Sequence, residues 1–69
     1  MGYSTDLLKA RKDANNTIEK FPKLSADIND AFDLMLNEIE AGESEENEID
    51  HFYSYMVELT SWLILKTFK

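Results

Sequence analysis

Apolar residues in the last third of the chain recur at helical spacing and predict a helix over residues 45–67. One face of this helix collects Ile49, Phe52, Tyr53, Met56, Val57, Leu63 and Ile64. A second line, with steps of four, three, four and three residues, lies on the opposite side of the helix and consists of His51, Tyr55, Glu58, Trp62 and Leu65. A helix that carries apolar side chains on two sides needs two neighbours. What covers the second line is therefore the main question that the sequence raises.

Two further helices are predicted upstream, over about residues 5–20 and 25–41. The first has a thin apolar line of mostly small or medium-sized side chains, made of Leu7, Ala10, Ala14, Ile18 and Phe21. The second has a regular stripe at spacings of three and four, made of Leu24, Ile28, Phe32, Met35 and Ile39 and widened by Ala31 and Leu36. Such a stripe is typical of an amphipathic helix with one buried face.

Local signals place the ends of the first two helices. Ser4 or Thr5 can cap the first helix, because a hydroxyl oxygen accepts a free backbone N–H there. Pro22 disfavours the helical conformation at Phe21 and so separates the two helices. The second helix then begins either at Pro22 or with Ser25 as its cap.

Gly42 is suited to end the second helix, and Ser44 can cap the third. Short connections of this kind are typical of antiparallel neighbours. The sequence therefore predicts an all-α fold, a small antiparallel three-helix bundle that forms a single domain over residues 1–69. A helical hairpin that pairs into a dimer is the alternative.

Charge is distributed unevenly along the 69 residues, whose net charge is −7. Residues 1–23 hold five basic and three acidic residues, whereas residues 24–65 hold eleven acidic residues and no Lys or Arg. This distribution disfavours direct binding to nucleic acid or to an anionic membrane, because both attract cationic side chains. It favours a basic protein as the partner.

Cysteine is absent, which excludes disulfides and thiolate metal sites. The absence fits a reducing cytosol, and we expect a cytoplasmic protein. The N-terminus lacks the apolar run of a signal peptide. The longest uninterrupted apolar run, Trp62 to Leu65, is far shorter than the ~20 residues of a membrane span, so no membrane insertion is expected.

Glu48 and His51, three residues apart, match half of a carboxylate-bridged di-metal site. The second half would need another histidine, and the chain has one. A Cys nucleophile and a glycine-rich phosphate loop are both missing, and a chain of this size leaves little volume for a cofactor pocket. We therefore expect no metal, no cofactor and no enzymatic activity.

These features favour a non-enzymatic protein–protein interaction module, a small regulator or inhibitor that binds a basic surface of another protein. The acidic part of the expected binding surface comprises Asp27, Asp30, Asp33, Glu40, Glu43, Glu45, Glu46 and Glu48. The second line of the last helix completes this surface with His51, Tyr55, Glu58, Trp62 and Leu65. In one version of the hypothesis the carboxylates imitate nucleic-acid phosphates. The composition is similar to that of short regulatory or inhibitory proteins, including phage-encoded ones, which is an analogy of class alone.

Other interpretations account for the same residues. The acidic face can serve solubility only. The second line can be covered by the first helix, or by a second copy in a homodimer, in which case the protein is a structural or assembly subunit. Because Tyr and Trp are enriched at the centres of protein contacts, we expect Tyr55 and Trp62 to be at least partly exposed in the monomer.

Overall fold

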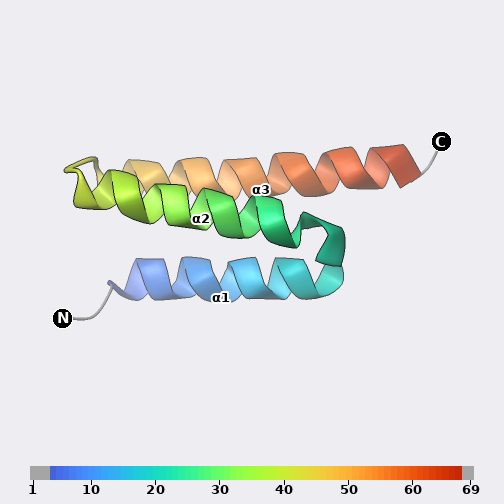
Figure 1. Ribbon diagram of the computed structural model, residues 1–69, viewed down its shortest axis with the longest axis horizontal. Helices are drawn as coiled ribbons and strands as arrows, with labels where there is room; N and C mark the ends of the chain where they lie inside the picture. The colour runs from blue at the N-terminus through green and yellow to red at the C-terminus, as the bar shows by residue number, and fades with distance from the viewer. Residues whose placement is uncertain (1–3, 68–69) are drawn as a thin grey trace.

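The computed structural model describes residues 4–67, and every regular element in that range is helical. Helix α1 spans Thr5–Lys20, α2 spans Ser25–Glu40 and α3 spans Glu45–Thr67, with the short 3-10 helix η1, Pro22–Leu24, between α1 and α2. Figure 1 shows the chain passing three times along the long axis of the molecule, and each of the three helices contacts the other two. The predicted all-α three-helix fold is confirmed, and the predicted helix bounds agree with the structure to within one residue.

Ser4 fixes the start of α1. Its hydroxyl oxygen accepts a hydrogen bond from the backbone N–H of Leu7 at 3.2 Å, so Ser4 rather than Thr5 is the cap. The same hydroxyl donates a hydrogen bond to Glu45 Oε2 at 2.7 Å. This bond ties the start of α1 to the start of α3, so both helices begin at the same end of the bundle.

Pro22 separates α1 from α2, as expected. Phe21 leaves the helical region with φ −131° and ψ 73°, and Pro22 becomes the first residue of η1 rather than of α2. Ser25 already has helical angles, φ −52° and ψ −52°, and the capping position falls to the apolar Leu24. The predictions that α2 begins at Pro22 or is capped by Ser25 are therefore wrong, because η1 runs directly into α2.

A Schellman turn joins α2 to α3. Gly42 has a φ of 106°, a conformation that residues with a Cβ rarely adopt. Its N–H donates to the carbonyl oxygen of Ile39 at 3.1 Å, and the N–H of Glu43 donates to that of Glu38 at 3.0 Å. Ser44 then caps α3 by accepting a backbone N–H at 3.4 Å.

The core lies where the three helices meet. The rings of Phe32 on α2 and Phe52 on α3 pack edge to face, with centroids 5.4 Å apart. On α1, Ala10 and Ala14 are fully buried, and their small side chains let α1 approach the other helices closely. The buried apolar residues are Leu7, Ala10, Ala14, Leu24, Ile28, Phe32, Met35, Ile49, Phe52 and Met56.

The core-facing line of α3 differs from the predicted face at two positions. Val57 and Ile64, which the prediction included, are 62% and 42% exposed. Leu63, which the prediction also included, packs against the core as expected, and so does Leu59, which the prediction did not include. At 3.6 residues per turn, Met56, Leu59 and Leu63 lie on the same face of α3. Val57 and Ile64 each lie about 100° further around the helix, away from the core.

Helix α1 does not cover the second line of α3. It packs against the core-facing side of the α2–α3 pair, where Asp13 accepts a hydrogen bond from the hydroxyl of Tyr53. The interpretation in which the first helix covers the second line is therefore wrong, and the expected exposure of Tyr55 and Trp62 is confirmed. All residues of this line, called the outer line below, are exposed: His51, Tyr55, Glu58, Trp62 and Leu65.

Helix α3 is the longest helix, with 23 residues against 16 in α1 and 16 in α2. At a rise of 1.5 Å per residue, the additional length is about 10 Å. The C-terminal turns of α3 therefore extend past η1, where neither neighbour flanks them (Figure 1). Within residues 4–67, no helix combines the length and the apolar composition that crossing a bilayer requires.

Candidate functional site

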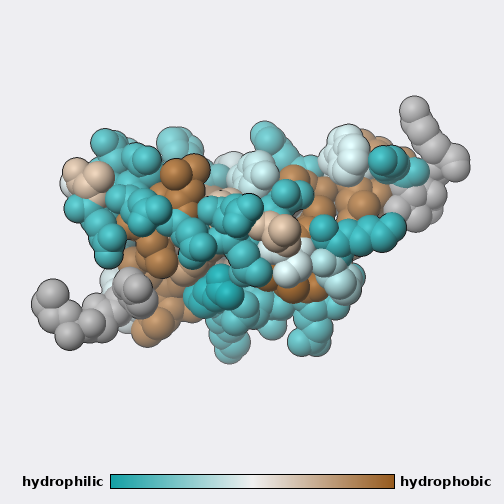
Figure 2. Space-filling view, viewed as in Figure 1, coloured by the Kyte–Doolittle hydropathy of each residue, from teal (hydrophilic) through white to brown (hydrophobic). Residues whose placement is uncertain are grey.

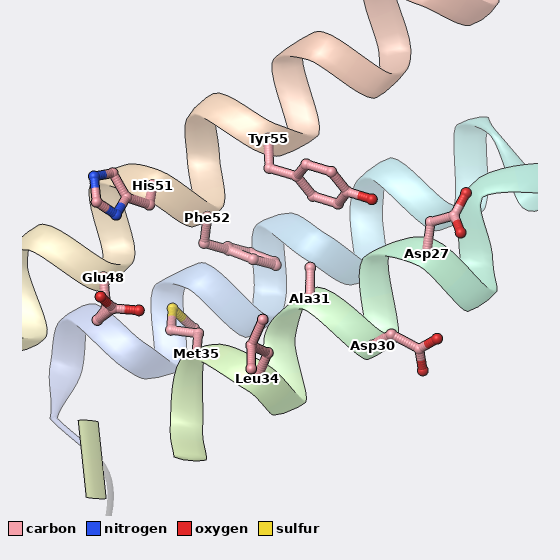
Figure 3. Close-up of a pocket in the computed structure, with 9 residues that line it drawn as sticks. All are labelled: Asp27, Asp30, Ala31, Leu34, Met35, Glu48, His51, Phe52 and Tyr55. Carbon is pink, nitrogen blue, oxygen red and sulfur yellow. The ribbon is translucent and has the colours of Figure 1, made fainter. Parts of the chain in front are cut away.

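An open groove lies between α2 and α3, with α1 behind the pair (Figure 3). Its volume is about 480 Å³. The residues that line this α2–α3 groove are Asp27, Asp30, Ala31, Leu34 and Met35 from α2 and Glu48, His51, Phe52 and Tyr55 from α3.

The floor and walls of the α2–α3 groove are apolar. Met35 and Phe52 belong to the core and form the floor between the two helices. Leu34 and Tyr55 stand on either side and are 60% and 40% exposed. Figure 3 shows the ring of Tyr55 extending from α3 toward α2. Apolar side chains at this level of exposure lose contact with water when a second surface covers them.

The rim of the α2–α3 groove is acidic on both sides. Asp27 and Asp30 line it from α2, and Glu48 lines it from α3. Among the lining residues, His51 is the only one with a titratable nitrogen. Because residues 24–65 contain no Lys or Arg, a cationic group that enters the groove meets carboxylates without a competing cation from that part of the chain.

The outer line of α3 continues the α3 wall of the groove beyond α2. Trp62 and Leu65 follow Tyr55 at helical spacing and are 59% and 69% exposed. The ammonium of Lys66 lies 4.8 Å from the centroid of the Trp62 ring, so one face of this ring already accepts a cation. Figure 2 shows apolar surface near the C-terminal end of α3, among hydrophilic side chains.

Two of the predicted acidic residues lie in other grooves of the bundle. Asp33 lines a groove between α1 and α2 together with Arg11, and Glu46 lines one between α1 and α3 together with Lys9. Both grooves therefore hold charges of both signs. The α2–α3 groove is distinguished from them by the absence of Lys and Arg among its lining residues.

The remaining predicted acids lie near the turn between α2 and α3. Glu45 accepts the hydrogen bond from Ser4 and thereby serves the fold. Glu40 and Glu43 are exposed on either side of Gly42. They contribute negative potential at that end of the bundle without lining the α2–α3 groove.

The structure thus brings together some of the predicted binding residues and separates others. Those that share the α2–α3 groove are Asp27, Asp30, Glu48, His51 and Tyr55. The prediction missed Leu34, the most exposed apolar side chain of the groove. Leu34 lies one helical turn after Asp30 and directly before Met35 in the sequence. A leucine beside the buried stripe of an amphipathic helix is expected at the edge of the core, and this is the signal that could have identified it.

Glu48 and His51, the two candidate metal ligands, both line the α2–α3 groove. Within residues 4–67, no group of three His, Asp or Glu side chains is placed to hold a metal ion. The arrangement offers an apolar floor, two exposed walls and carboxylates on both rims. It is suited to binding a surface that is apolar in the middle and cationic at its edges.

Comparisons with protein-family models, with curated proteins and with solved structures find no match for this chain. A function is therefore inferred from the geometry and the charge of the α2–α3 groove.

Proposed function

We propose that this protein is a non-enzymatic interaction module that binds a basic surface of another protein through the α2–α3 groove and the outer line of α3. The observation that carries the proposal is the combination, in one groove, of an apolar floor with a rim that is acidic on both sides. Inhibition or modulation of the partner is the expected consequence, because the bound protein would cover part of the partner's surface.

Charge and apolar contact have separate roles in this proposal. The carboxylates of Asp27, Asp30 and Glu48 attract and orient the partner, and they repel acidic proteins. Leu34, Tyr55 and the Trp62 side chain supply apolar area whose burial stabilises the complex by roughly 25 cal/mol per Å². Affinity should therefore fall with added salt but remain measurable at high salt.

The distribution of the carboxylates does not favour imitation of a strip of phosphates. A phosphate strip requires carboxylates along one continuous surface. Asp33 and Glu46 lie in other grooves, beside Arg11 and Lys9. Asp27 and Asp30 border a groove with an apolar centre, and not a continuous acidic surface.

A homodimer is the second candidate, favoured by the exposed apolar residues on the extended end of α3. Trp62 and Leu65 lie there without cover from α1 or α2. In this case the protein is an assembly subunit, and Trp62→Ala dissociates it. Light scattering over about a hundredfold range of concentration separates the two candidates, because a dimer that dissociates in the micromolar range loses mass on dilution.

The proposed function is tested by affinity capture from an extract of the native cells, with the captured proteins quantified by mass spectrometry. The test pair is Asp30→Lys and Leu34→Ser, which alter the α2–α3 groove. The control pair is Asp33→Lys and Leu8→Ser, which alter the α1–α2 groove, and Leu8 is 58% exposed, close to the exposure of Leu34. Circular dichroism verifies that all variants are folded.

The expected result is a basic protein that both control variants capture as well as the wild type does and that both test variants lose. Capture of the same proteins by all four variants, or no protein above the background of the tag, would contradict the proposed function.

A further inference from the structure

We infer that the partner presents to the α2–α3 groove a single amphipathic helix of about four turns, with one apolar line flanked on both sides by Lys or Arg. This inference rests on the proposed function, since it specifies the element of the basic partner that the groove accepts. It follows from the spacing of the lining residues, the length of the exposed face and the placement of the carboxylates.

The spacing of the groove residues matches a helix as the occupant. On α2, positions 27, 30, 31, 34 and 35 line the groove, and on α3 positions 48, 51, 52 and 55 do so. The α3 set has the i, i+3, i+4, i+7 spacing and the α2 set extends the same spacing by one residue, so each wall is one face of a helix about two turns long. Helices pack by placing the ridge of one in the groove between ridges of others, at interaxial distances of about 8–10 Å. An added helix would lie on the pair opposite α1 and complete a four-helix arrangement.

The exposed face has a definite length. The outer line extends from His51 to Leu65, which at 1.5 Å per residue is about 21 Å. A helix of about 14 residues, or four turns, has the same length. One part of it would lie between Leu34 and Tyr55, and the rest would pack on Trp62 and Leu65 alone.

The carboxylates define where the cations of that helix lie. Asp27 and Asp30 are on the α2 rim, and Glu48 is on the α3 rim. Glu58, exposed on the outer line, continues the α3 side between Tyr55 and Trp62. A matching helix therefore carries basic residues on both flanks of its apolar line. The Trp62 ring, with Lys66 over one face, offers a further site for an Arg or Lys of the partner.

The probe for this inference is a peptide of about 15 residues built only from Leu and Lys, with the leucines at i, i+3, i+4 and i+7. A matched peptide has the same composition except for two central Pro residues, which prevent the helix while retaining the lysines that flank them. Trp62 is the only Trp of the chain, so its fluorescence reports binding at the outer line directly. The titration uses the full chain at low and at physiological salt.

The expected result is that the helical peptide binds at least about tenfold more tightly than the Pro-containing one and shifts the Trp62 emission to shorter wavelength. Leu34→Ser and Asp30→Asn should each weaken this binding by about threefold to tenfold. Leu8→Ser and Asp33→Asn, the matched changes in the α1–α2 groove, should leave it within about twofold.

Several results would overturn the inference, and they differ in what they imply for the proposed function. If both peptides bind equally well and Asp30→Asn abolishes the binding of both, the groove binds basic chains but does not require a helix. The inference would then fail, and the proposed function would stand. Equal effects of the groove variants and the α1–α2 variants would mean that attraction is nonspecific, and both claims would fail. Absence of binding at low salt would also refute both. A dimer that Trp62→Ala dissociates would identify a second copy as the occupant.

Discussion

The hydroxyl of Tyr53 on α3 donates a hydrogen bond to Oδ2 of Asp13 on α1, across 2.5 Å. Together with the bond between Ser4 and Glu45, it links α1 to α3 on the side away from the α2–α3 groove. Burial of the phenol raises the pKa of Tyr53 from 10.0 to about 12, assisted by the hydrogen bond to Asp13 and by the negative charges of Asp13 and Asp6.

This shift predicts a loss of stability at alkaline pH. The unfolded chain releases the Tyr53 proton near pH 10, and the folded chain keeps it until about pH 12. Between these values the unfolded chain binds fewer protons, so the free energy of unfolding falls as the pH rises, and below pH 10 the contribution is fully present. Urea unfolding of the wild type and of Tyr53→Phe across this range should show a steeper fall for the wild type. Curves that run parallel would contradict the assignment.

At neutral pH, Tyr53→Phe should lower the free energy of unfolding by about 1 kcal/mol, because a hydrogen bond to a carboxylate is lost at a half-buried site. Tyr55→Phe is the matched control, since Tyr55 is exposed in the groove and should change stability by less than about 0.5 kcal/mol. Urea denaturation followed by far-UV circular dichroism measures both. A larger effect at Tyr55 than at Tyr53 would refute the assigned roles.

Replacement of Gly42 should destabilise the turn between α2 and α3. The space around it is open, since a Cβ added there would meet nothing within 4 Å, but the φ of 106° strains any L side chain. Gly42→Ala should therefore lower the free energy of unfolding by about 1–2 kcal/mol, and Gly42→Asn by less, because Asn tolerates positive φ better. Thermal unfolding compares the two. An unchanged midpoint for Gly42→Ala would mean that the turn adopts another conformation in solution.

Substitution at Ile28 tests the packing of the core. Ile28 is fully buried, so Ile28→Val should lower the free energy of unfolding by about 0.5–1.5 kcal/mol. Leu34→Ala removes more atoms from an exposed side chain and should cost less than about 0.5 kcal/mol. Chemical denaturation distinguishes the two. If Leu34→Ala is the more destabilising change, Leu34 is buried in solution and the α2–α3 groove is closed.

Removal of the Ser4 hydroxyl should lower the free energy of unfolding by about 1 kcal/mol, because Ser4→Ala removes the cap of α1 and the bond to Glu45. Ser54→Ala, an exposed position within α3, is the control and should have little effect. Hydrogen exchange locates the change: faster exchange in the first turn of α1 is expected, and faster exchange confined to α2 would contradict it.

The helix bounds followed from the sequence because the signals that set them are local. Pro22 disrupts the chain at its own position, and Gly42 ends α2 through its own φ. Ser25 misled for a related reason. A serine before an apolar stripe predicts a cap only where the preceding residues are not helical. Here the preceding residues form the 3-10 helix η1, so Ser25 lies inside a continuous helical segment.

The placement of α1 did not follow from the sequence. Two of its three buried side chains, Ala10 and Ala14, are small enough to fit either side of the α2–α3 pair. The side on which α1 packs is marked by two hydrogen bonds, Ser4–Glu45 and Asp13–Tyr53, each between residues about forty positions apart. No local pattern in the sequence predicts contacts at such a separation.

The candidate groove was predicted in parts only. The exposure of Asp27, Asp30 and Tyr55 followed from helical spacing. Their meeting in one groove depends on how α2 and α3 rotate about their axes, which is set by packing of the core rather than by either pattern. For the same reason Asp33, three residues from Asp30, lines a different groove.

The most direct test of the central claim is a heteronuclear NMR titration of the full chain with the helical Leu/Lys peptide. We expect the chemical-shift changes to concentrate at Leu34, Tyr55 and Trp62, with little change at Leu8 and Asp33. Changes that follow the α1–α2 groove instead, or that spread evenly over every acidic residue, would contradict the assignment of the α2–α3 groove as the binding site.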